Sequence, residues 1–450
     1  MCVAVLVNIS LHAEQFAAGL EETPVTVKAR RGRILDRRGN VLAESDEEGN
    51  RHYPSGLCAH AVGTLSASGD AQSGVELAMD ELLAGKDGIS GGDDEHSAIA
   101  GADVYLTIDS RIQQAAENIL RTAAENYAQG VDYDTKAPYS GSAGAVVVLD
   151  CRNGEVLAMA SYPTFDPETF SRDYESLAAA KDSPLLDRAS LGLYRPGSTM
   201  KTVTAVAALT EGSISGDTRF YCGSHLTVAG TGFSCMNSHG YLDVKQALSV
   251  SCNIFFYRTA QRLGIKGLLR YQSLFGFGEQ PAFILPTLSG QLASPENTTP
   301  WSDAQLVQAA IGQSSMTCTP LQMAICALTL ADRGTRYSPS LILGVGTRSS
   351  VSHVLPGKPV SAFRSRAAFS MTIEGMISST RFTHGEFSLS QLDKPCAIKT
   401  GTPQSPRGYD STVIGFYPAD DPQIAFCVML EGGANAKHTV YELVSAAVSE

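Results

Sequence analysis

The stretch Pro196-Gly197-Ser198-Thr199-Met200-Lys201 runs directly into an apolar segment with helical spacing that continues to Leu209. Proline and glycine immediately before a helix place Ser198 in its first turn, where free backbone N–H groups and the helix dipole stabilise negative charge. Lys201 follows three residues later and lies on the same helix face. A lysine acts as a base only when it is neutral, which requires burial or a nearby cation. The stretch indicates a serine nucleophile with an amine base, although alone it is more often a capping serine beside an exposed lysine.

A second polar segment, Ser251-Cys252-Asn253, interrupts an apolar run from Ala247 to Phe256. Polar side chains in such surroundings need hydrogen-bond partners. One interpretation is a helix cap or a buried polar network without catalytic meaning. The functional interpretation makes Ser251 a proton relay and Asn253 a group that orients the lysine or a substrate amide.

A third segment, Lys399-Thr400-Gly401-Thr402, ends a strand-like run. Glycine lets another backbone approach closely, hydroxyl groups with a cation can bind a carboxylate, and an exposed strand can pair with a peptide. Lys399 is also a candidate for the cation that lowers the pKa of Lys201. The segment therefore predicts a substrate-binding strand.

Composition limits the class of protein. A chain of 450 residues is expected to form two or three units. The net charge of −12 argues against a nucleic-acid partner, because phosphate binding needs clustered lysine and arginine. The ten cysteines form no C-x-x-C pair and show no His/Cys spacing typical of zinc, so we expect no metal and no cofactor. Cys222 and Cys235 could form a disulfide in an oxidising compartment.

The composition and residue pattern change along the chain. Residues 1–24 are interpreted as a possible remnant of a membrane anchor with its linker, because the apolar run 1–11 is about half the length that crosses a bilayer. That run could equally be a buried strand or helix. Residues 25–100 are predicted to form a compact amino-terminal module, and the glycine-rich, acidic stretch 88–101 is the best linker candidate.

Residues 101–450 are predicted to form the main domain. Strand-like runs near both of its ends flank a largely helical middle, which predicts an α+β fold whose sheet joins distant parts of the chain. Within it we expect a helix that begins at Asp109 or Ser110, a hairpin at Asn153-Gly154, and a terminal helix over residues 440–448.

The three polar segments lie far apart in the sequence, and only a tertiary fold can bring them together. In this combination the chain resembles the class B penicillin-binding proteins, and among them the compact members similar to penicillin-binding proteins A and 2. These are bacterial cell-wall transpeptidases. The resemblance runs from about residue 25 to the end and includes Arg31-Gly32-Arg33-Ile34-Leu35-Asp36-Arg37-Arg38-Gly39-Asn40, Tyr53-Pro54-Ser55-Gly56, Gly74-Val75-Glu76, Leu106-Thr107-Ile108-Asp109, Tyr194-Arg195-Pro196-Gly197 and Thr319-Pro320-Leu321-Gln322-Met323-Ala324.

The resemblance implies a penicillin-binding transpeptidase or serine β-lactamase-like fold, in which helices flank a mixed antiparallel sheet, with a small amino-terminal pedestal. It makes Ser198 the acylated nucleophile, Lys201 its base, and Ser251 and Asn253 the groups for proton transfer and orientation. Lys399, Thr400, Gly401 and Thr402 would bind the substrate and its carboxylate. The backbone N–H groups of Ser198 and Thr402 would form the oxyanion hole. No metal ligand is implied.

The implied reaction releases D-Ala from the D-Ala-D-Ala end of a peptidoglycan stem peptide, forms an acyl-enzyme, and ends with aminolysis by a second stem. β-Lactam antibiotics would be trapped as slow acyl-enzymes. The family carries an amino-terminal anchor, so the catalytic domain is expected on the extracytoplasmic side of the cell membrane. Nothing in the sequence resembles a glycosyltransferase, so a separate membrane glycan polymerase of the SEDS type is the expected partner.

Three alternatives stay open. A D,D-carboxypeptidase would share the same three segments. A β-lactamase or β-lactam sensor would resolve the acyl-enzyme with water, but the amino-terminal module and the long spacing to Lys399 argue against it, as does the lack of a Glu-x-x-Leu-Asn segment after Asn253. A non-catalytic scaffold for division or elongation proteins could keep the fold, although intact Ser198, Lys201 and Lys399 argue against that role.

Overall fold

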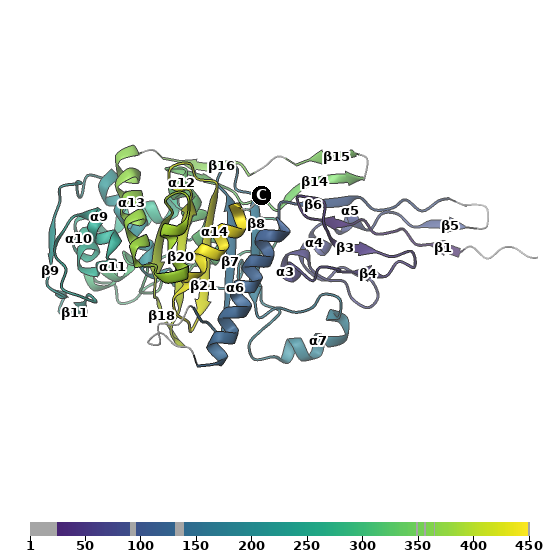
Figure 1. The fold of residues 1–450 in the computed structure, drawn as a ribbon, viewed down its shortest axis with the longest axis horizontal. Helices are drawn as coiled ribbons and strands as arrows, with labels where there is room; N and C mark the ends of the chain where they lie inside the picture. Colours follow the sequence, from purple (N-terminus) through teal and green to yellow (C-terminus); the bar gives the residue numbers. More distant parts are fainter. Residues whose placement is uncertain are drawn as a thin grey trace, which may run out of the picture.

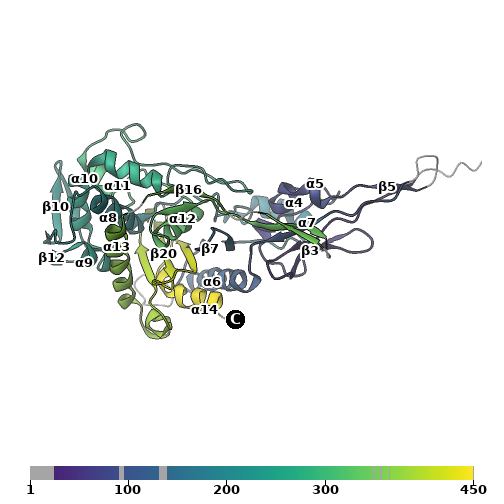
Figure 2. The same cartoon turned by 90° about the horizontal axis from the view of Figure 1, so that it is seen from above.

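The computed structural model describes residues 25–90, 96–130, 139–347, 350–354, 357–363 and 365–448. The molecule is elongated, with a helix-rich body at one end and a narrow sheet module at the other (Figures 1 and 2). The expected anchor remnant, residues 1–24, lies outside the described residues. Within those residues, no helix combines the length and apolar character needed to cross a membrane.

An antiparallel sheet forms the centre of the main domain. Over the described residues it has five strands in the order β17-β20-β21-β7-β8. Their bounds are β17 (Ala397–Gly401), β20 (Ser411–Tyr417), β21 (Ile424–Glu431), β7 (Ala143–Asp150) and β8 (Val156–Tyr162). The β7–β8 hairpin turns where it was predicted, because Gly154 adopts a φ of 75° that favours glycine. Strands from both ends of the domain thus lie side by side.

Helices cover both faces of this sheet, which explains why strands such as β7 and β21 are continuous apolar runs rather than alternating ones. Val146, Val148 and Val428 pack in the core beneath α6 (Ser110–Ala128) and α14 (Val440–Val448). Their neighbours along the strands pack on the opposite side, in the core of α8 (Lys201–Thr210) and α12 (Pro320–Ala331). The predicted α+β class with a helix-flanked sheet is confirmed, and Asp109 caps α6 as expected.

The helical body lies on the β20 side of the central sheet and contains the middle of the chain (Figure 1). Its main helices are α9 (Val244–Ser249), α10 (Asn253–Leu274), α11 (Asp303–Ala309) and α13 (Arg366–Ser379). A short 3-10 turn, η1 (Gly197–Met200), leads into α8. Two small hairpins project from the body: β9 (Phe220–Cys222) pairs with β12 (Gly240–Leu242), and β10 (His225–Val228) pairs with β11 (Thr231–Ser234).

The amino-terminal module is built around a second sheet, whose strand order over the described residues is β15-β14-β6-β2-β3-β4. The strands of this sheet are β2 (Ile34–Leu35), β3 (Val41–Ser45), β4 (Arg51–His52), β6 (Asp103–Leu106), β14 (Ile342–Thr347) and β15 (Ser350–His353). Three of these strands come from beyond residue 100, so the sheet contains strands from both sides of the predicted domain boundary. The boundary itself stays a prediction.

The described part of the stretch 88–101 is not a linker, and that prediction is wrong. Strand β5 (Gly88–Ser90) pairs with β1 (Val25–Val27), and Lys86 forms a bridge with Ile99. Gly101 packs so closely against the backbone of Leu83 that a side chain would not fit there. At Gly88 and Gly101, glycine permits close backbone approach.

The remaining elements complete the molecule: α3 (Ala59–Val62), α4 (Gly74–Ala78), α5 (Asp80–Leu83), α7 (Phe170–Ala179), β13 (Thr335–Tyr337), β16 (Pro359–Ala362), η2 (Thr380–Phe382), η3 (Gly385–Phe387), η4 (Leu389–Gln391), β18 (Gln404–Ser405), β19 (Gly408–Tyr409) and η5 (Ala436–Thr439).

A buried ion-pair cluster holds the amino-terminal module together. The Glu76 carboxylate, which is fully buried, accepts from Arg31 Nε and Arg51 Nε at 2.7 Å each. Both arginines are nearly buried, and Arg51 also donates to the backbone carbonyl of Gly32. Arg31 has a further partner in Asp80 at 2.6 Å, a carboxylate that is 46% exposed. The segments that carried the family resemblance here, around Arg31 and Glu76, therefore meet in one structural contact.

Candidate active site

Ser198 lies in the turn η1, half-buried beside strand β17. The turn is tightly constrained because Gly197, at a φ of 57°, donates its N–H to the carbonyl of Gly312 at 2.9 Å. The Thr199 hydroxyl donates back to the carbonyl of Pro196 at 2.7 Å. These contacts hold the serine at the entrance to α8, where the first-turn N–H groups have no intrahelical acceptor.

Lys201 is the first residue of α8 and its side chain is fully buried. Its ammonium nitrogen donates to the Ser251 carbonyl at 2.7 Å, to Ser251 Oγ at 3.2 Å and to Asn253 Oδ1 at 2.6 Å. Within the described part of the chain, no carboxylate pairs with it and no hydrogen bond joins it to Ser198. Burial lowers the pKa of Lys201 to about 8, an effect that the nearby Cys235 and Cys252 oppose. The base predicted from the sequence is therefore placed where its neutral form becomes accessible.

The segment Ser251-Cys252-Asn253 joins α9 to α10. Ser251 adopts a left-handed conformation with a φ of 54°, which is uncommon for a residue with a side chain. Cys252 caps α10, its sulfur accepting from the Phe255 N–H at 3.5 Å. Asn253 donates its side-chain amide to the carbonyl of Ser234 at 3.2 Å, which leaves its oxygen to accept from Lys201.

The Ser251 hydroxyl has a second amine partner, Lys399. It lies on β17, is 1% exposed, and donates to Ser251 Oγ and to the Thr400 carbonyl at 2.9 Å each. Burial, followed by the charge of Lys201, lowers the pKa of Lys399 well below its usual value. Of the two causes considered from the sequence, burial or a nearby cation such as Lys399, burial is the main one for both amines.

Strand β17 forms one edge of the central sheet. Among the strands that the structure describes it pairs only with β20, so its other edge is free of strand partners. Gly401 packs against the turn that carries Ser198: a Cβ there would lie 2.9 Å from the Pro196 carbonyl oxygen. Thr400 is half-buried and Thr402 exposed. The fold thus brings the three sequence segments together: hydrogen bonds join Lys201 and Lys399 to Ser251, and the turn that carries Ser198 packs against the edge strand β17.

Comparison with known proteins agrees with this arrangement. The family model described as the penicillin binding protein transpeptidase domain matches residues 144–449. The chain belongs to this family.

Relatives of this member of the family are of two kinds, curated sequences and solved structures. Peptidoglycan D,D-transpeptidase MrdA of Acinetobacter baumannii is 28% identical over 444 residues, which cover 85% of this chain and 63% of that protein. The chain thus spans less than two thirds of the length of that relative. The class B resemblance inferred from the motifs is confirmed.

Two solved structures extend the comparison. The D,D-transpeptidase domain of a peptidoglycan glycosyltransferase from Eggerthella lenta has a TM-score of 0.79 at 28% identity, covering 94% of this chain and 99% of that one. Pseudomonas aeruginosa PBP2, in complex with WCK 5153, has a TM-score of 0.80 at 27% identity, covering 95% and 97%. Both match nearly the whole chain, including the amino-terminal module.

The sequence did not indicate two groups of residues beside the candidate site. Glu431, at the end of β21, accepts from the Tyr194 hydroxyl at 2.6 Å and from Arg188 Nε at 2.9 Å, and so holds the segment that precedes Ser198. The sequence pointed to Tyr194 as part of a motif but not to its partner, 237 residues away.

The second group contains thiols. Cys222 and Cys235 are free, so the disulfide considered from the sequence is not formed. Instead, these two side chains lie together with His239 and Cys252. The sequence spacing of these residues is not typical of zinc, and for that reason no metal site was expected. No short repeat signals this group, because its members come from separate strands and a helix cap.

Proposed function

We propose that this chain is a peptidoglycan D,D-transpeptidase that works through a serine acyl-enzyme. The observation that carries the proposal is the meeting of two buried lysines, Lys201 and Lys399, at the hydroxyl of Ser251 beside Ser198. Two ammonium groups held at one hydroxyl in a buried site repel each other, so one amine is favoured in its neutral form. A neutral amine at this position can accept the proton of a serine that attacks a carbonyl.

In the proposed reaction, Ser198 Oγ attacks the carbonyl of the penultimate D-Ala of a stem peptide, and its proton passes to the amine of Lys201. The bond to the terminal D-Ala then breaks, and that D-Ala leaves as an amine after receiving the proton. An amine from a second stem attacks the ester, loses a proton to the site, and restores the serine. The backbone N–H groups of Ser198 and Thr402 would stabilise the oxyanion in both halves of the reaction.

The substrate would bind along the free edge of β17 as an added strand. Thr400 is half-buried and Thr402 is exposed, whereas Lys399 is buried. We propose that the hydroxyls contact the substrate carboxylate and that Lys399 orients the Ser251 hydroxyl through its hydrogen bond to Oγ. A side chain at position 401 would clash with the turn that carries Ser198, so glycine is required there. β-Lactams would enter the same site and acylate Ser198.

The direct test is covalent labelling with a fluorescent penicillin, followed by intact mass measurement. We expect one adduct on the parent protein, located on Ser198 by peptide mapping, and none on Ser198→Ala. Ser176→Ala, an exposed serine on α7, is the matched control and should label like the parent. Equal labelling of Ser198→Ala would remove the nucleophile assignment. Product analysis with donor and acceptor stems then separates cross-linking from hydrolysis.

The acylation rate should depend on pH through Lys201. Burial lowers the pKa of this amine to about 8, so below that pH it is an ammonium that cannot accept a proton. The second-order rate constant for penicillin acylation should therefore rise about tenfold per pH unit toward pH 8 and then level off. Stopped-flow measurements across this range check it. A rate that stays flat, or falls as the pH rises, contradicts the assignment of Lys201 as base.

We also propose that the protein acts on the extracytoplasmic side of the cell membrane and cooperates with a glycan polymerase of the SEDS type. Support comes from the family resemblance alone. Co-purification of the polymerase from detergent-solubilised membranes, compared with a mock purification, tests this partner.

A further inference from the structure

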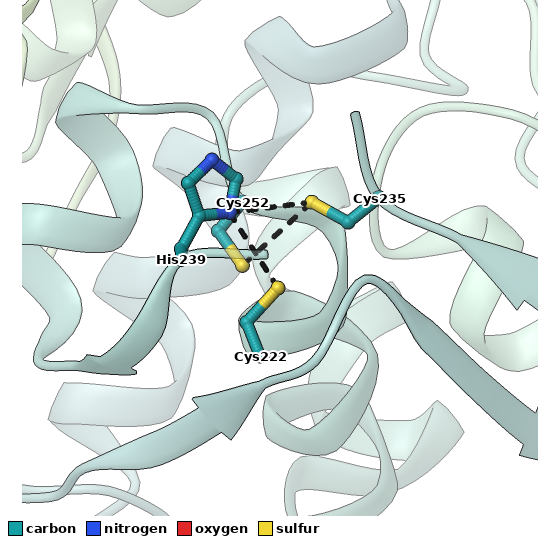
Figure 3. A group of neighbouring side chains, drawn as sticks. All are labelled: Cys222, Cys235, His239 and Cys252. Atoms are coloured by element: carbon teal, nitrogen blue, oxygen red, sulfur yellow. Dashed lines mark hydrogen bonds between the residues drawn. The ribbon is translucent and has the colours of Figure 1, made fainter. Parts of the chain in front are cut away.

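Four side chains with metal-binding atoms point toward one another at the base of the hairpins (Figure 3). Cys222 ends β9, Cys235 follows β11, His239 precedes β12, and Cys252 caps α10. Their ligand atoms all lie within 4.8 Å of one another. The three cysteines are buried, with exposed fractions of 1%, 8% and 0% in the order given, and His239 is half-buried.

The spacing of these atoms matches a tetrahedral metal site. Nδ1 of His239 lies 3.5 Å from the sulfur of Cys222 and 3.6 Å from that of Cys235, and the sulfurs of Cys235 and Cys252 are 3.9 Å apart. A tetrahedral zinc ion with Zn–S bonds of about 2.3 Å and Zn–N bonds of about 2.0 Å places its ligands roughly 3.5–3.8 Å apart. A disulfide would need a sulfur separation of about 2.05 Å, far shorter than the Cys235–Cys252 distance.

The surroundings suit bound thiolates. The backbone N–H of Asn253, at the start of α10, donates to the sulfur of Cys235 at 3.3 Å. The Phe255 N–H donates to the sulfur of Cys252. The backbone N–H of His239 donates to the Cys222 carbonyl at 3.0 Å, which fixes one ligand relative to another. Such second contacts orient ligands and stabilise the anionic sulfur.

From this geometry we propose that Cys222, Cys235, His239 and Cys252 bind one Zn²⁺ as a closed structural site. Three thiolates and one imidazole fill all four tetrahedral positions and leave none for substrate or water. The ion would therefore act in folding rather than in chemistry. Binding releases the protons of the three thiols and changes no oxidation state.

The metal would connect the two hairpins to the segment Ser251-Cys252-Asn253, called here the catalytic segment. Each pair, β9–β12 and β10–β11, has only two strands and much exposed surface, and isolated hairpins of this kind are marginally stable. Three ligands come from this region. The fourth, Cys252, stands between Ser251 and Asn253, the two residues that accept from Lys201. Metal binding does not depend on the proposed function, whereas its effect on acylation does.

Metal content and cobalt spectroscopy test the site without any variant. Protein purified without added metal should retain about one equivalent of zinc per chain in elemental mass spectrometry. After stripping under reducing conditions, Co²⁺ alone should produce the visible bands of a tetrahedral site together with thiolate-to-cobalt charge-transfer absorption. A native protein that holds no zinc and yields no such bands overturns the proposal. So does a disulfide among Cys222, Cys235 and Cys252 in non-reducing peptide maps of the native protein.

Two variants and a control sharpen the test. Cys222→Ser, a ligand outside the catalytic segment, should lose the zinc and the charge-transfer absorption. Cys151→Ser, a buried cysteine outside the group, should keep both. If Cys222→Ser does not fold, His239→Cys tests the ligand set instead. Its fourth thiolate should keep the metal and strengthen the charge-transfer band. Retention of zinc at the parent level by folded Cys222→Ser would contradict the ligand set.

The catalytic consequence is measured separately. Stripped parent protein should acylate about tenfold more slowly than the same sample reloaded with Zn²⁺. Equal rates would contradict the link between the metal and the Ser251 segment. If the reloaded protein binds zinc but does not label with penicillin at all, the proposed function fails while the metal site stands.

Discussion

Lys201→Met is expected to lower the rate of penicillin acylation by roughly 10²–10⁴-fold while the protein stays folded. Methionine keeps a long apolar side chain in the buried site but has no amine to accept the Ser198 proton. The cost in stability is limited by the retained volume, although the Ser251 carbonyl and Asn253 Oδ1 lose their donor. Stopped-flow acylation with a fluorescent penicillin measures the rate, and circular dichroism checks the fold.

The matched control is Lys245→Met. Lys245 pairs with Glu374 at 3.0 Å on the surface, with 45% of its side chain exposed, so its loss should change the acylation rate little. Parent-like acylation by folded Lys201→Met would transfer the base role to another group, with Lys399 the first candidate because it reaches the same hydroxyl.

Glu76→Ala is expected to destabilise the amino-terminal module by about 3–5 kcal/mol. The substitution leaves Arg31 and Arg51 nearly buried without the carboxylate that both contact. Arg51 would be affected most, because Arg31 keeps Asp80 as a partner. Calorimetry should show a lower midpoint for the transition that includes this module. Acylation by the folded protein should change much less, because Glu76 lies in a different sheet module from Ser198.

Asp80→Ala provides the comparison for this cluster. The Asp80 carboxylate pairs with Arg31 at 2.6 Å, but the Asp80 side chain is 46% exposed, so water can take its place beside Arg31. Its loss should cost about 0–1 kcal/mol. If Glu76→Ala and Asp80→Ala destabilised the protein equally, burial would not be the reason for the importance of Glu76.

Local patterns predicted the elements that depend on nearby residues. Asp109 caps α6 because its carboxylate reaches the N–H of Arg111, two positions along the chain. The turn at Gly154 and the helix over residues 440–448 follow equally short-range rules. The buried strands β7 and β21 were visible as apolar runs, although their pairing partners were not. The linker prediction was wrong for the described part of stretch 88–101, because a glycine such as Gly101 can indicate either flexibility or close packing, and only its neighbours in space distinguish the two.

The candidate site divides in the same way. The chain order and residue types alone indicated a serine, an amine three positions away and two distant polar segments, because these features are local or resemble a family. Only the tertiary structure decided that Lys201 and Lys399 share the Ser251 hydroxyl, since burial and approach of side chains 198 residues apart depend on the packing of sheet and helices. The Cys222, Cys235, His239 and Cys252 group was equally hidden, because its tetrahedral spacing is created by two hairpins and a helix end meeting in space.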